Sequence, residues 1–522
     1  MLRLDGTAHR LRAVVGKPRS GLLSECVQVD HRGALQGAGR AALNLNFQYV
    51  LYLHGMFFCK DFRSRHLGQC DSIFEHQVSL SDDLAIKTLA QRTSSAKRQV
   101  KTPFSRSHQH QVKLQTILAE AARLFNFQGT RATTLGDISQ SLGLTKTSLY
   151  YYARNKEELV YKCYLASCDA GDEIMAEAAR DAATGLESVL NFVKIFLARG
   201  DEIALGRRPP VAMLVEIPSL AAKHRKEIEA RMGRHFDALL GFLHRGIEDG
   251  SVAAECAPIP TTQALLSIVS WSYVWYGRIP IDARPAVVEQ LISLVQDGVS
   301  ARPHRFQDIE FPEADARLPA GFDRDEQNLL KRNAFLRVGS MMFNERGYMG
   351  ASLDDVAEQL NVTKGAFYYH IRNKEDLLYQ CFKRAIELDD EMIARASNAG
   401  RNGAEKIELV LRYLFNVQHS EDGPLIRFRS LPSLSEKRRE EILGLTGAIS
   451  DRLGALISEG IRDGSVRDVN PAVIENAMIG TVDAAPDIGL HMHFSDNARV
   501  SAEYLQLFFN GIANRRRRRA VR

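Results

Sequence analysis

The sequence contains a long internal repeat, and this feature limits the folds open to the chain more than any other. Residues 125–164 align with residues 343–382 without a gap at an offset of 218, and 17 of the 40 aligned positions are identical. The likeness continues at an offset of 214, where Pro218-Ser219-Leu220 recurs as Pro432-Ser433-Leu434. A repeat of about 200 residues is far longer than a solenoid unit, so it predicts that a whole domain is duplicated.

Length and composition agree with a globular, multidomain chain. The 522 residues allow two to four domains, and 45% apolar with 25% charged residues exclude a collagen-like or wholly disordered chain. Seven cysteines, an odd number without a C-x-x-C pair, argue against a disulfide framework and favour a reducing setting. Neither a run of ~18 apolar residues nor a secretion signal is visible, so we expect no membrane partner.

Each repeat carries the apolar periodicity of an all-α fold. Between residues 114 and 125, apolar residues recur at i, i+3, i+4, i+7, i+10 and i+11, and residues 335–343 repeat that face. Gly129 and Gly347 follow where a helix would end on glycine. Helical spacing returns at 186–198, 225–249, 404–418 and 438–463.

The ends of the chain are basic. Residues 1–110 hold 16 Lys and Arg against 8 Asp and Glu, a net +8, whereas the whole chain is +5. Residues 515–519 are five consecutive arginines. Basic ends on a nearly neutral body indicate contact with a polyanion, and a solvated tail is the alternative interpretation. Residues 1–107 have no counterpart in the second repeat, and their composition predicts a largely disordered extension.

These observations predict the domain organisation. Residues 302–322 hold three prolines without helical periodicity and read as a linker. The expected divisions are a basic extension (1–107), a first helix-turn-helix domain (108–164), a first helical domain (165–301), the linker (302–322), a second helix-turn-helix domain (323–382), a second helical domain (383–514) and an Arg-rich tail (515–522).

A short helix, a tight turn and a second short helix can be read within each repeat. Thr134 heads a Thr-x-x-Asp arrangement and Ser352 heads its counterpart, so both are expected to cap a helix. Gly143 or Asn361 follows, and both tolerate the left-handed conformation of a turn. The second helix is predicted to have about seven residues, KTSLYYY or KGAFYYH, with an apolar residue facing the core. This geometry lets a helix enter a DNA major groove.

Both segments resemble the N-terminal DNA-binding domain of the tetracycline-repressor (TetR) family, whose pattern resembles T-x-x-D-I-A, G-V-S/T-x-x-x-L/F-Y-x-H-F and x-x-K-x-x-L. The first copy matches with Thr134, Asp137, Ile138, Gly143, Thr145, Leu149, Tyr150 and Lys156, and the second with Ser352, Asp355, Val356, Thr363, Phe367, Tyr368, His370 and Lys374. The first copy departs at Tyr152 and Ala153, where the family usually has histidine and an aromatic residue.

The resemblance implies which residues touch DNA. In the first repeat these are Thr134, Lys146, Thr147, Ser148, Tyr150, Tyr151, Tyr152 and Lys156; in the second they are Ser352, Lys364, Gly365, Ala366, Tyr368, Tyr369, His370 and Lys374. Lysines and tyrosine hydroxyls of this kind bind phosphates, and residues near the start of the second helix approach base edges. Because the two copies differ at 147/365, 148/366 and 152/370, we expect unlike half-sites. The alternative is a helical hairpin with surface tyrosines and no role in DNA binding.

The resemblance also implies a helical domain that binds a small molecule and pairs with a second subunit, and about 140 residues per repeat suit it. Trp271, Trp275 and Tyr276 form an aromatic run similar to that of relatives that sense acyl-CoA or steroid-CoA thioesters. Aromatic packing between helices is the alternative. The second repeat has Ala484 and Ile488 near the tryptophan positions, so we expect only the first repeat to bind this ligand.

The sequence therefore predicts a sequence-specific transcriptional regulator, a ligand-responsive repressor connected with lipid or acyl-CoA metabolism. Its expected partners are an operator of double-stranded DNA and a small hydrophobic or acyl-CoA-like effector, in the bacterial cytoplasm at the nucleoid. Neither enzymatic activity nor a cofactor is expected, and the two His-x-His pairs (108/110 and 491/493) lack the further ligands of a metal site. The alternative is that one repeat binds DNA and the other only dimerises or senses.

The duplication finally predicts an intrachain pseudo-dimer, with a homodimer of chains also open. Helical segments near 262–278 and 285–300 are expected to pack on their counterparts near 470–485 and 497–512. The linker is long enough to permit this, since about 20 residues at ~3.3 Å each span up to ~65 Å.

Overall fold

The computed structural model describes residues 106–214, 216–309, 324–420 and 422–514, and these are all-α, as predicted. In the described ranges the β contacts are two isolated bridges, and no strand is formed. The predicted disordered extension, apart from its last two residues, lies outside the described residues, as do the Arg-rich tail and much of the linker.

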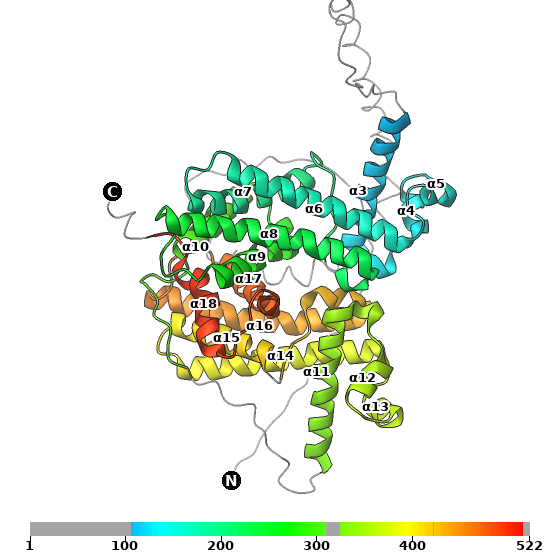
Figure 1. The fold of residues 1–522 in the computed structure, drawn as a ribbon. Coiled ribbons are helices and arrows are strands. Elements are labelled where there is room, and N and C mark those ends of the chain that lie inside the picture. The colour runs from blue at the N-terminus through cyan, green and yellow to red at the C-terminus, as the bar shows by residue number, and fades with distance from the viewer. Residues whose placement is uncertain (1–105, 215, 310–323, 421, 515–522) are drawn as a thin grey trace, which may run out of the picture. The chain divides into compact units, whose positions relative to one another are not determined.

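The two repeats present the same order of elements (Figure 1). The first comprises α3 (Arg106–Ala132), α4 (Leu135–Ser141), α5 (Lys146–Tyr150), α6 (Lys156–Arg180), α7 (Gly185–Ala204), η4 (Ile217–Ser219), α8 (Ala222–Glu248), α9 (Pro258–Trp275), η5 (Tyr276–Arg278) and α10 (Arg284–Asp297). The second comprises α11 (Arg324–Gly350), α12 (Leu353–Gln359), α13 (Lys364–His370), α14 (Lys374–Ala399), α15 (Gly403–His419), η6 (Phe428–Ser433), α16 (Glu436–Asp463), α17 (Pro471–Asp483), η7 (Ala485–Leu490) and α18 (Asn497–Asn510).

The predicted glycine interruptions lie inside the first helix of each repeat rather than at its assigned end. Gly129 has φ 82° and ψ 154°, and Gly347 has φ 67° and ψ 170°, so the helical backbone is broken at both positions. Positive φ values are the reason that glycine stands there, since an L-residue would be strained. A last turn follows each break before α4 or α12 begins.

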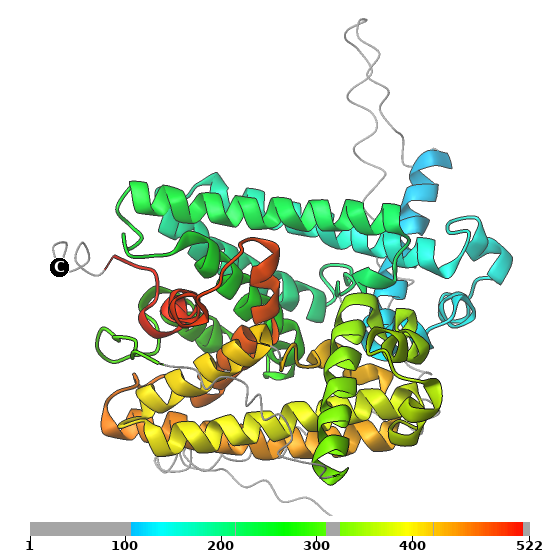
Figure 2. The same ribbon diagram turned by 60° about the horizontal axis from the view of Figure 1, so that its bottom comes forward.

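Three hydrophobic clusters hold these helices together. One lies in each helix-turn-helix unit, around Leu149 in the first and Phe367 in the second. The third is built by both repeats together and runs from α6 and α7 through α9 and α10 to α15, α17 and α18. Figure 2 shows α14 and α16 of the second repeat side by side along this shared core. The two helical domains therefore bury one common interior.

The centre of the shared core is the contact between α9 and α17, with α18 packed on α9 and α10. Trp271 on α9 donates a hydrogen bond from Nε1 to Oδ1 of Asn476 on α17 (3.3 Å). Gly480 allows this approach, because a Cβ there would lie 2.7 Å from Cβ of Trp271. These are the helical pairs whose packing the sequence predicts.

The segments after the last helix of each repeat cross to the other repeat in a reciprocal way. Ser300, which follows the first repeat, forms an antiparallel bridge with Val466 of the second repeat. Ala513, which follows the second repeat, forms the equivalent bridge with Val252 of the first repeat. The hydrogen bonds have the same reciprocity. The amide of residue 467 donates to the carbonyl of residue 299 (2.8 Å), and that of residue 253 to the carbonyl of residue 512 (2.9 Å).

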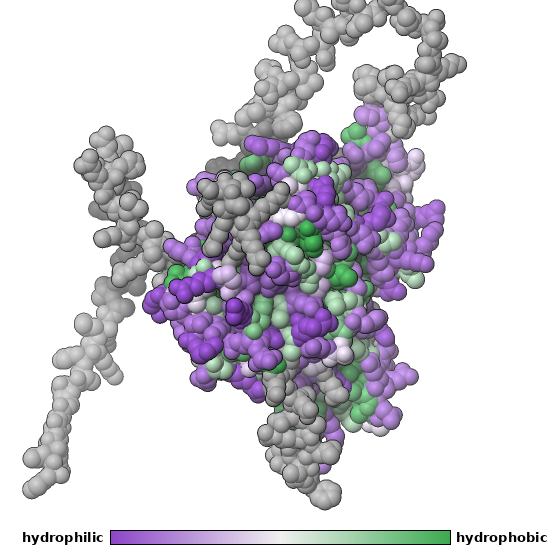
Figure 3. Space-filling model, turned by 60° about the vertical axis from the view of Figure 1, so that its left-hand side comes forward, coloured by the Kyte–Doolittle hydropathy of each residue, from purple (hydrophilic) through white to green (hydrophobic). Residues whose placement is uncertain are grey.

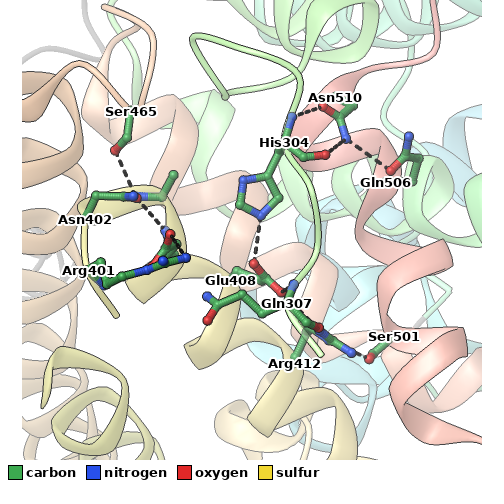
Figure 4. A network of polar contacts seen from close by, with 12 residues as sticks. His304, Gln307, Arg401, Asn402, Glu408, Arg412, Ser465, Ser501, Gln506 and Asn510 are labelled. Atoms are coloured by element: carbon green, nitrogen blue, oxygen red, sulfur yellow. Dashed lines mark hydrogen bonds and ion pairs between the residues drawn. The ribbon is translucent and has the colours of Figure 1, made fainter. Parts of the chain in front are cut away.

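The first part of the linker is bound to the second repeat (Figure 4). Nε2 of His304 lies 2.8 Å from Oε2 of Glu408, and the amide of Gln307 donates to Oε1 of the same carboxylate (2.9 Å). Arg412 completes the network by donating to the Gln307 carbonyl (2.6 Å). Burial raises the pKa of Glu408, but the hydrogen bonds from His304 and Gln307 outweigh this and lower it. Arg412 also donates to Oε1 of Glu408 (3.0 Å), so this fully buried carboxylate is held ionised by three partners.

Candidate nucleic-acid interface

The first helix of each helix-turn-helix unit is capped as predicted. Oγ1 of Thr134 accepts from the Asp137 amide (3.1 Å) while the Asp137 carboxylate accepts from the Thr134 amide (2.7 Å), which completes a capping box. Ser352 accepts from the amides of Asp354 (3.2 Å) and Asp355 (3.4 Å). Hydrogen bonds from the Thr134 amide and hydroxyl lower the pKa of Asp137. These caps fix where α4 and α12 begin.

The turn has the predicted left-handed residue in both copies. Gly143 has φ 63° and Asn361 has φ 52°, the one positive φ at a non-glycine position in the described ranges. Oγ1 of Thr145 then accepts from the Ser148 amide, and Oγ1 of Thr363 from the Ala366 amide, both at 3.2 Å. The second helix therefore begins at a lysine in each repeat.

The second helix is amphipathic, with one buried anchor and one exposed face. Leu149 and Phe367 are 0% exposed and belong to the cores of their units. Tyr151 is 76% exposed and Tyr369 is 83% exposed. The other exposed members of the two predicted faces are Lys146, Thr147, Ser148 and Tyr150, and Lys364, Gly365, Ala366 and Tyr368. The structure thus gathers these sequence-predicted residues on one solvent-facing surface per repeat, which we call reader 1 and reader 2.

The second helix has the predicted length of seven residues in reader 2 but not in reader 1. There α5 ends at Tyr150, and the amide of Tyr152 makes a tighter turn, from residue i to i−3, by donating to the Leu149 carbonyl (2.9 Å). Tyr152 and its counterpart His370 are half-buried, and each packs against the long helix that precedes the helix-turn-helix, α3 or α11. Tyr152 stacks on His110 (4.8 Å between ring centroids), and His370 lies 5.5 Å from Phe335.

The last predicted contact in each reader is the lysine that opens the following helix. Asn155 caps α6 by accepting from the Glu158 amide (2.8 Å), and its counterpart Asn373 caps α14. Lys156 is half-buried, and burial lowers its pKa against the opposing effect of Glu216 and Asp137. Nζ of Lys374 donates to the Met349 carbonyl (3.1 Å). Both lysines are the first residue of their helix, and the N-terminal amides of a helix can bind phosphate.

The two readers differ electrostatically at one position. In reader 2, Nζ of Lys364 forms an ion pair with Oδ2 of Asp354 at 2.6 Å, and this pair raises the pKa of Lys364. In reader 1 the residue at the position of Asp354 is Gly136, and the Lys146 side chain lies over it. Lys146 therefore lacks the carboxylate that neutralises its counterpart.

In each repeat, an asparagine that was not predicted from the sequence joins the helix-turn-helix unit to the helical domain. Asn126 on α3 donates to the Val211 carbonyl (2.8 Å) and accepts from the Met213 amide (2.8 Å). Asn344 on α11 holds the Leu425 carbonyl (2.8 Å) and the residue 427 amide (3.1 Å) in the same way. The signal was present, since Phe-Asn is identical in the two aligned segments.

A cavity of about 1790 Å³ lies beside these joints. Its walls come from α3, α6, α7, α8 and α9 of the first repeat and from α11, α14, η6, α16, α17 and η7 of the second. Of the aromatic run predicted to bind a ligand, Trp271 lines this cavity, whereas Trp275 and Tyr276 are buried elsewhere and are not among its described lining residues. Tyr276 instead donates to Asp201 (3.0 Å). Arg208 to Val211 form part of the wall.

The described residues contain no helix long and apolar enough to span a membrane. They also contain no group of three or more His, Cys, Asp or Glu side chains that could hold a metal ion. His491 stacks on Phe236 with 3.6 Å between ring centroids. Figure 3 shows a face on which hydrophilic residues predominate and apolar residues form smaller groups.

Comparison with known families matches both halves of each repeat. Residues 117–162 and 335–381 match the family described as bacterial regulatory proteins, tetR family. Residues 197–299 and 400–487 match the tetracyclin repressor-like C-terminal domain, so the matches cover more than half of the chain. The chain belongs to the tetR family of bacterial regulatory proteins. It is a tandem member, because it carries both parts of the family twice.

Individual members of the tetR family correspond to one repeat of this chain. The HTH-type transcriptional repressor KstR2 of Rhodococcus jostii is 28% identical over 193 residues, which are 36% of this chain and 91% of that protein. The fatty acid metabolism regulator protein of Bacillus subtilis is 24% identical over 174 residues, 33% of this chain and 90% of that protein. The crystal structure of PfmR from Thermus thermophilus is 29% identical with a TM-score of 0.29, covering 34% of this chain and 95% of that one.

Proposed function

We propose that this tetR-family protein is a ligand-responsive repressor in which one chain acts as a pseudo-dimer on one operator with two non-identical half-sites. The single observation that carries this is the reciprocity of the contacts between the repeats. A two-fold dimer interface is self-complementary, so that each contact occurs twice with the subunits exchanged. Here the pairs 300/466 and 513/252 meet that criterion within one chain.

Close packing at the crossing supports the same conclusion. A Cβ on Gly298 would lie 2.2 Å from the Phe509 carbonyl oxygen, and a Cβ on Gly511 would lie 2.3 Å from that of Gln296. These glycines are counterparts, and both have positive φ, 69° and 67°. An obligate interface of this kind, continuous with a shared core, has the character of a permanent dimer rather than a transient contact.

Each reader then binds one half-site of the operator. Residues 147/365 and 148/366 differ between the exposed faces, Thr-Ser against Gly-Ala, so the hydrogen-bonding groups offered to base edges differ. We retain the predicted division into helix-turn-helix and helical domains as part of this proposal, together with the cytoplasmic, nucleoid-associated location that operator DNA requires. The effector is proposed to be a small hydrophobic or acyl-CoA-like molecule, in keeping with a relative named as a regulator of fatty acid metabolism.

The experiment selects bound DNA from a random pool with the full chain at 100 mM salt, and then measures the mass of the complex on the minimal selected duplex. We expect one chain per duplex and two unlike half-sites. Two chains that are both required on a minimal, perfectly palindromic site would refute the pseudo-dimer.

A second candidate is favoured by one observation, the neutralisation of Lys364 by Asp354. On this alternative, reader 1 binds DNA and the second repeat only pairs and senses. Substituting Tyr151 or its counterpart Tyr369 distinguishes the pseudo-dimer from this alternative. Both side chains are highly exposed and neither anchors a core, so their loss should not unfold the protein. The pseudo-dimer predicts that Tyr151→Ala and Tyr369→Ala each weaken binding to the selected duplex, whereas the alternative predicts that only Tyr151→Ala does.

A further inference from the structure

We propose that two turns cross between the repeats and fix the two helix-turn-helix units relative to each other, so that the chain accepts one separation of its half-sites, with Pro218 and Pro432 as positioning residues. This inference rests on the proposed function and deepens it, because it assigns the residues that set the separation. Turn 1 is residues 216–220, which include η4, and turn 2 is its counterpart, residues 430–434, which include the end of η6.

Each turn is anchored in the helix-turn-helix unit of its own repeat. Leu220 of turn 1 is buried in the core of the first unit, and Leu434 of turn 2 is buried in the core of the second. The amide that follows turn 1 donates to Oε1 of Glu157 on α6 (3.0 Å), and the amide that follows turn 2 donates to Oε1 of Glu375 on α14 (2.9 Å). Both turns are therefore held by their own units.

The same turns also pack against the other repeat. In the first repeat η4 contacts α11 of the second, and in the second repeat η6 contacts α3 of the first. Glu216 and Pro218 face α11 across a gap of about 10 Å³, at the lower limit of the ~10–15 Å³ that one water molecule needs. A Cβ built on Gly129 of α3 would lie 3.9 Å from Cβ of Pro432. Each turn thus joins both units, and the two joins are counterparts with the repeats exchanged.

Turn 1 also lies between the two lysines that are expected to bind phosphate. The charge of Glu216 opposes the lowering of the pKa of Lys156 that burial causes. Across the gap from Glu216, Tyr348 of α11 is buried, and Nζ of Lys374 lies 4.9 Å from the centroid of its ring. A shift of turn 1 between the units would therefore change the surroundings of both ammonium groups.

Joins at two places make DNA binding sensitive to the separation of the half-sites. One turn of B-DNA of ~34–36 Å holds about 10–10.5 base pairs, so two inserted base pairs move a half-site by about 7 Å and rotate it by about 70°. The units cannot follow that displacement without breaking the packing of the turns. Only one reader then engages, and the gain in affinity from simultaneous binding of both half-sites is lost.

The test compares the selected duplex with one that carries two additional base pairs between its half-sites. Fluorescence anisotropy gives the affinity of the full chain for each duplex at the same salt concentration, and the mass of each complex gives the number of chains. We expect one chain per selected duplex, and at least about fivefold weaker binding to the lengthened duplex. A smaller difference, with one chain bound, would overturn the inference. Two chains that are both required on the selected duplex would refute the proposed function, and this inference with it.

Three variants test the two prolines. Pro218→Gly, Pro432→Gly and the double variant remove the rings that face the other repeat and loosen the backbone of the turns. The double variant should reduce the difference between the duplexes to about twofold or less, because loosened units can follow the longer spacing. Pro280→Gly, the same change at an exposed position between η5 and α10, should leave the difference unchanged.

Thermal unfolding reports whether each variant is folded. The single variants should show intermediate differences, and they carry the test if the double variant does not fold. Weaker binding to both duplexes in the same proportion would mean that the prolines act on stability alone, and would overturn the inference.

Discussion

Removing the negative charge beside the reader 2 lysine is expected to strengthen DNA binding and to make it more dependent on salt. Asp354→Asn keeps the size of the side chain but abolishes the 2.6 Å ion pair with Lys364. Both partners are exposed, so the pair is worth only a factor of roughly two to five in an equilibrium constant. Released from it, Lys364 can neutralise one phosphate.

The magnitude follows from counterion release. One additional phosphate contact steepens the dependence of log K on log salt concentration by about 0.9. Between 50 and 200 mM NaCl, a slope difference of that size corresponds to about 3.5-fold in affinity. Fluorescence anisotropy of a labelled duplex across this range measures both quantities. Glu289→Gln on α10 is the matched control, because it makes the same change in net charge at an exposed position outside both readers.

The reciprocal substitution should have the opposite effect in reader 1. Gly136→Asp places a carboxylate near Lys146, whose Cε lies only 3.0 Å from where a Cβ on Gly136 would stand. We expect weaker binding and a slope shallower by up to about 0.9, while Gly136→Asn reports the steric effect alone. If Asp354→Asn behaves like Glu289→Gln, and Gly136→Asp like Gly136→Asn, the electrostatic asymmetry of the readers plays no part in DNA binding.

Three further predictions concern phosphate contacts, the crossing of the repeats and pH. Lys156→Ala and Lys374→Ala should each weaken binding about equally on all sequences and lower the salt slope by about one; unchanged slopes in both variants would exclude phosphate contacts there. Gly511→Ala should lower the free energy of unfolding by roughly 2–4 kcal/mol in a urea titration, since its Cβ would meet a backbone carbonyl, whereas Gly206→Ala, with a similar φ but open space, should cost only about 1 kcal/mol. Burial lowers the pKa of His491, so the unfolded state takes up that proton first and stability should fall as the pH drops below about 6.5; His491→Gln should flatten this part of a pH-stability profile measured from pH 5 to 8.

The local parts of the site were predictable from the sequence because their interactions lie within a few residues of one another. The Thr134 cap, the left-handed Gly143 and the buried Leu149 all belong to one stretch of 16 residues. Their chemistry is set by residue type: a hydroxyl that accepts an amide, a residue that tolerates positive φ, and an apolar side chain on one helical face. The length of α5 was not predictable to the residue, since the sequence pattern does not fix the hydrogen bonds of the last turn of a helix.

The sequence by itself determined that two helix-turn-helix units stand in one chain, where each begins and turns, and which helical pairs meet, because duplication and periodicity are written along the chain. Only the tertiary structure decided that the helical domains share a single core and that Arg429 stands at a cavity built mostly by the other repeat. The physical reason is distance along the chain. Burial, ion pairing and cavity volume depend on residues brought together from positions as far as 200 apart, and no local pattern records which of them will meet.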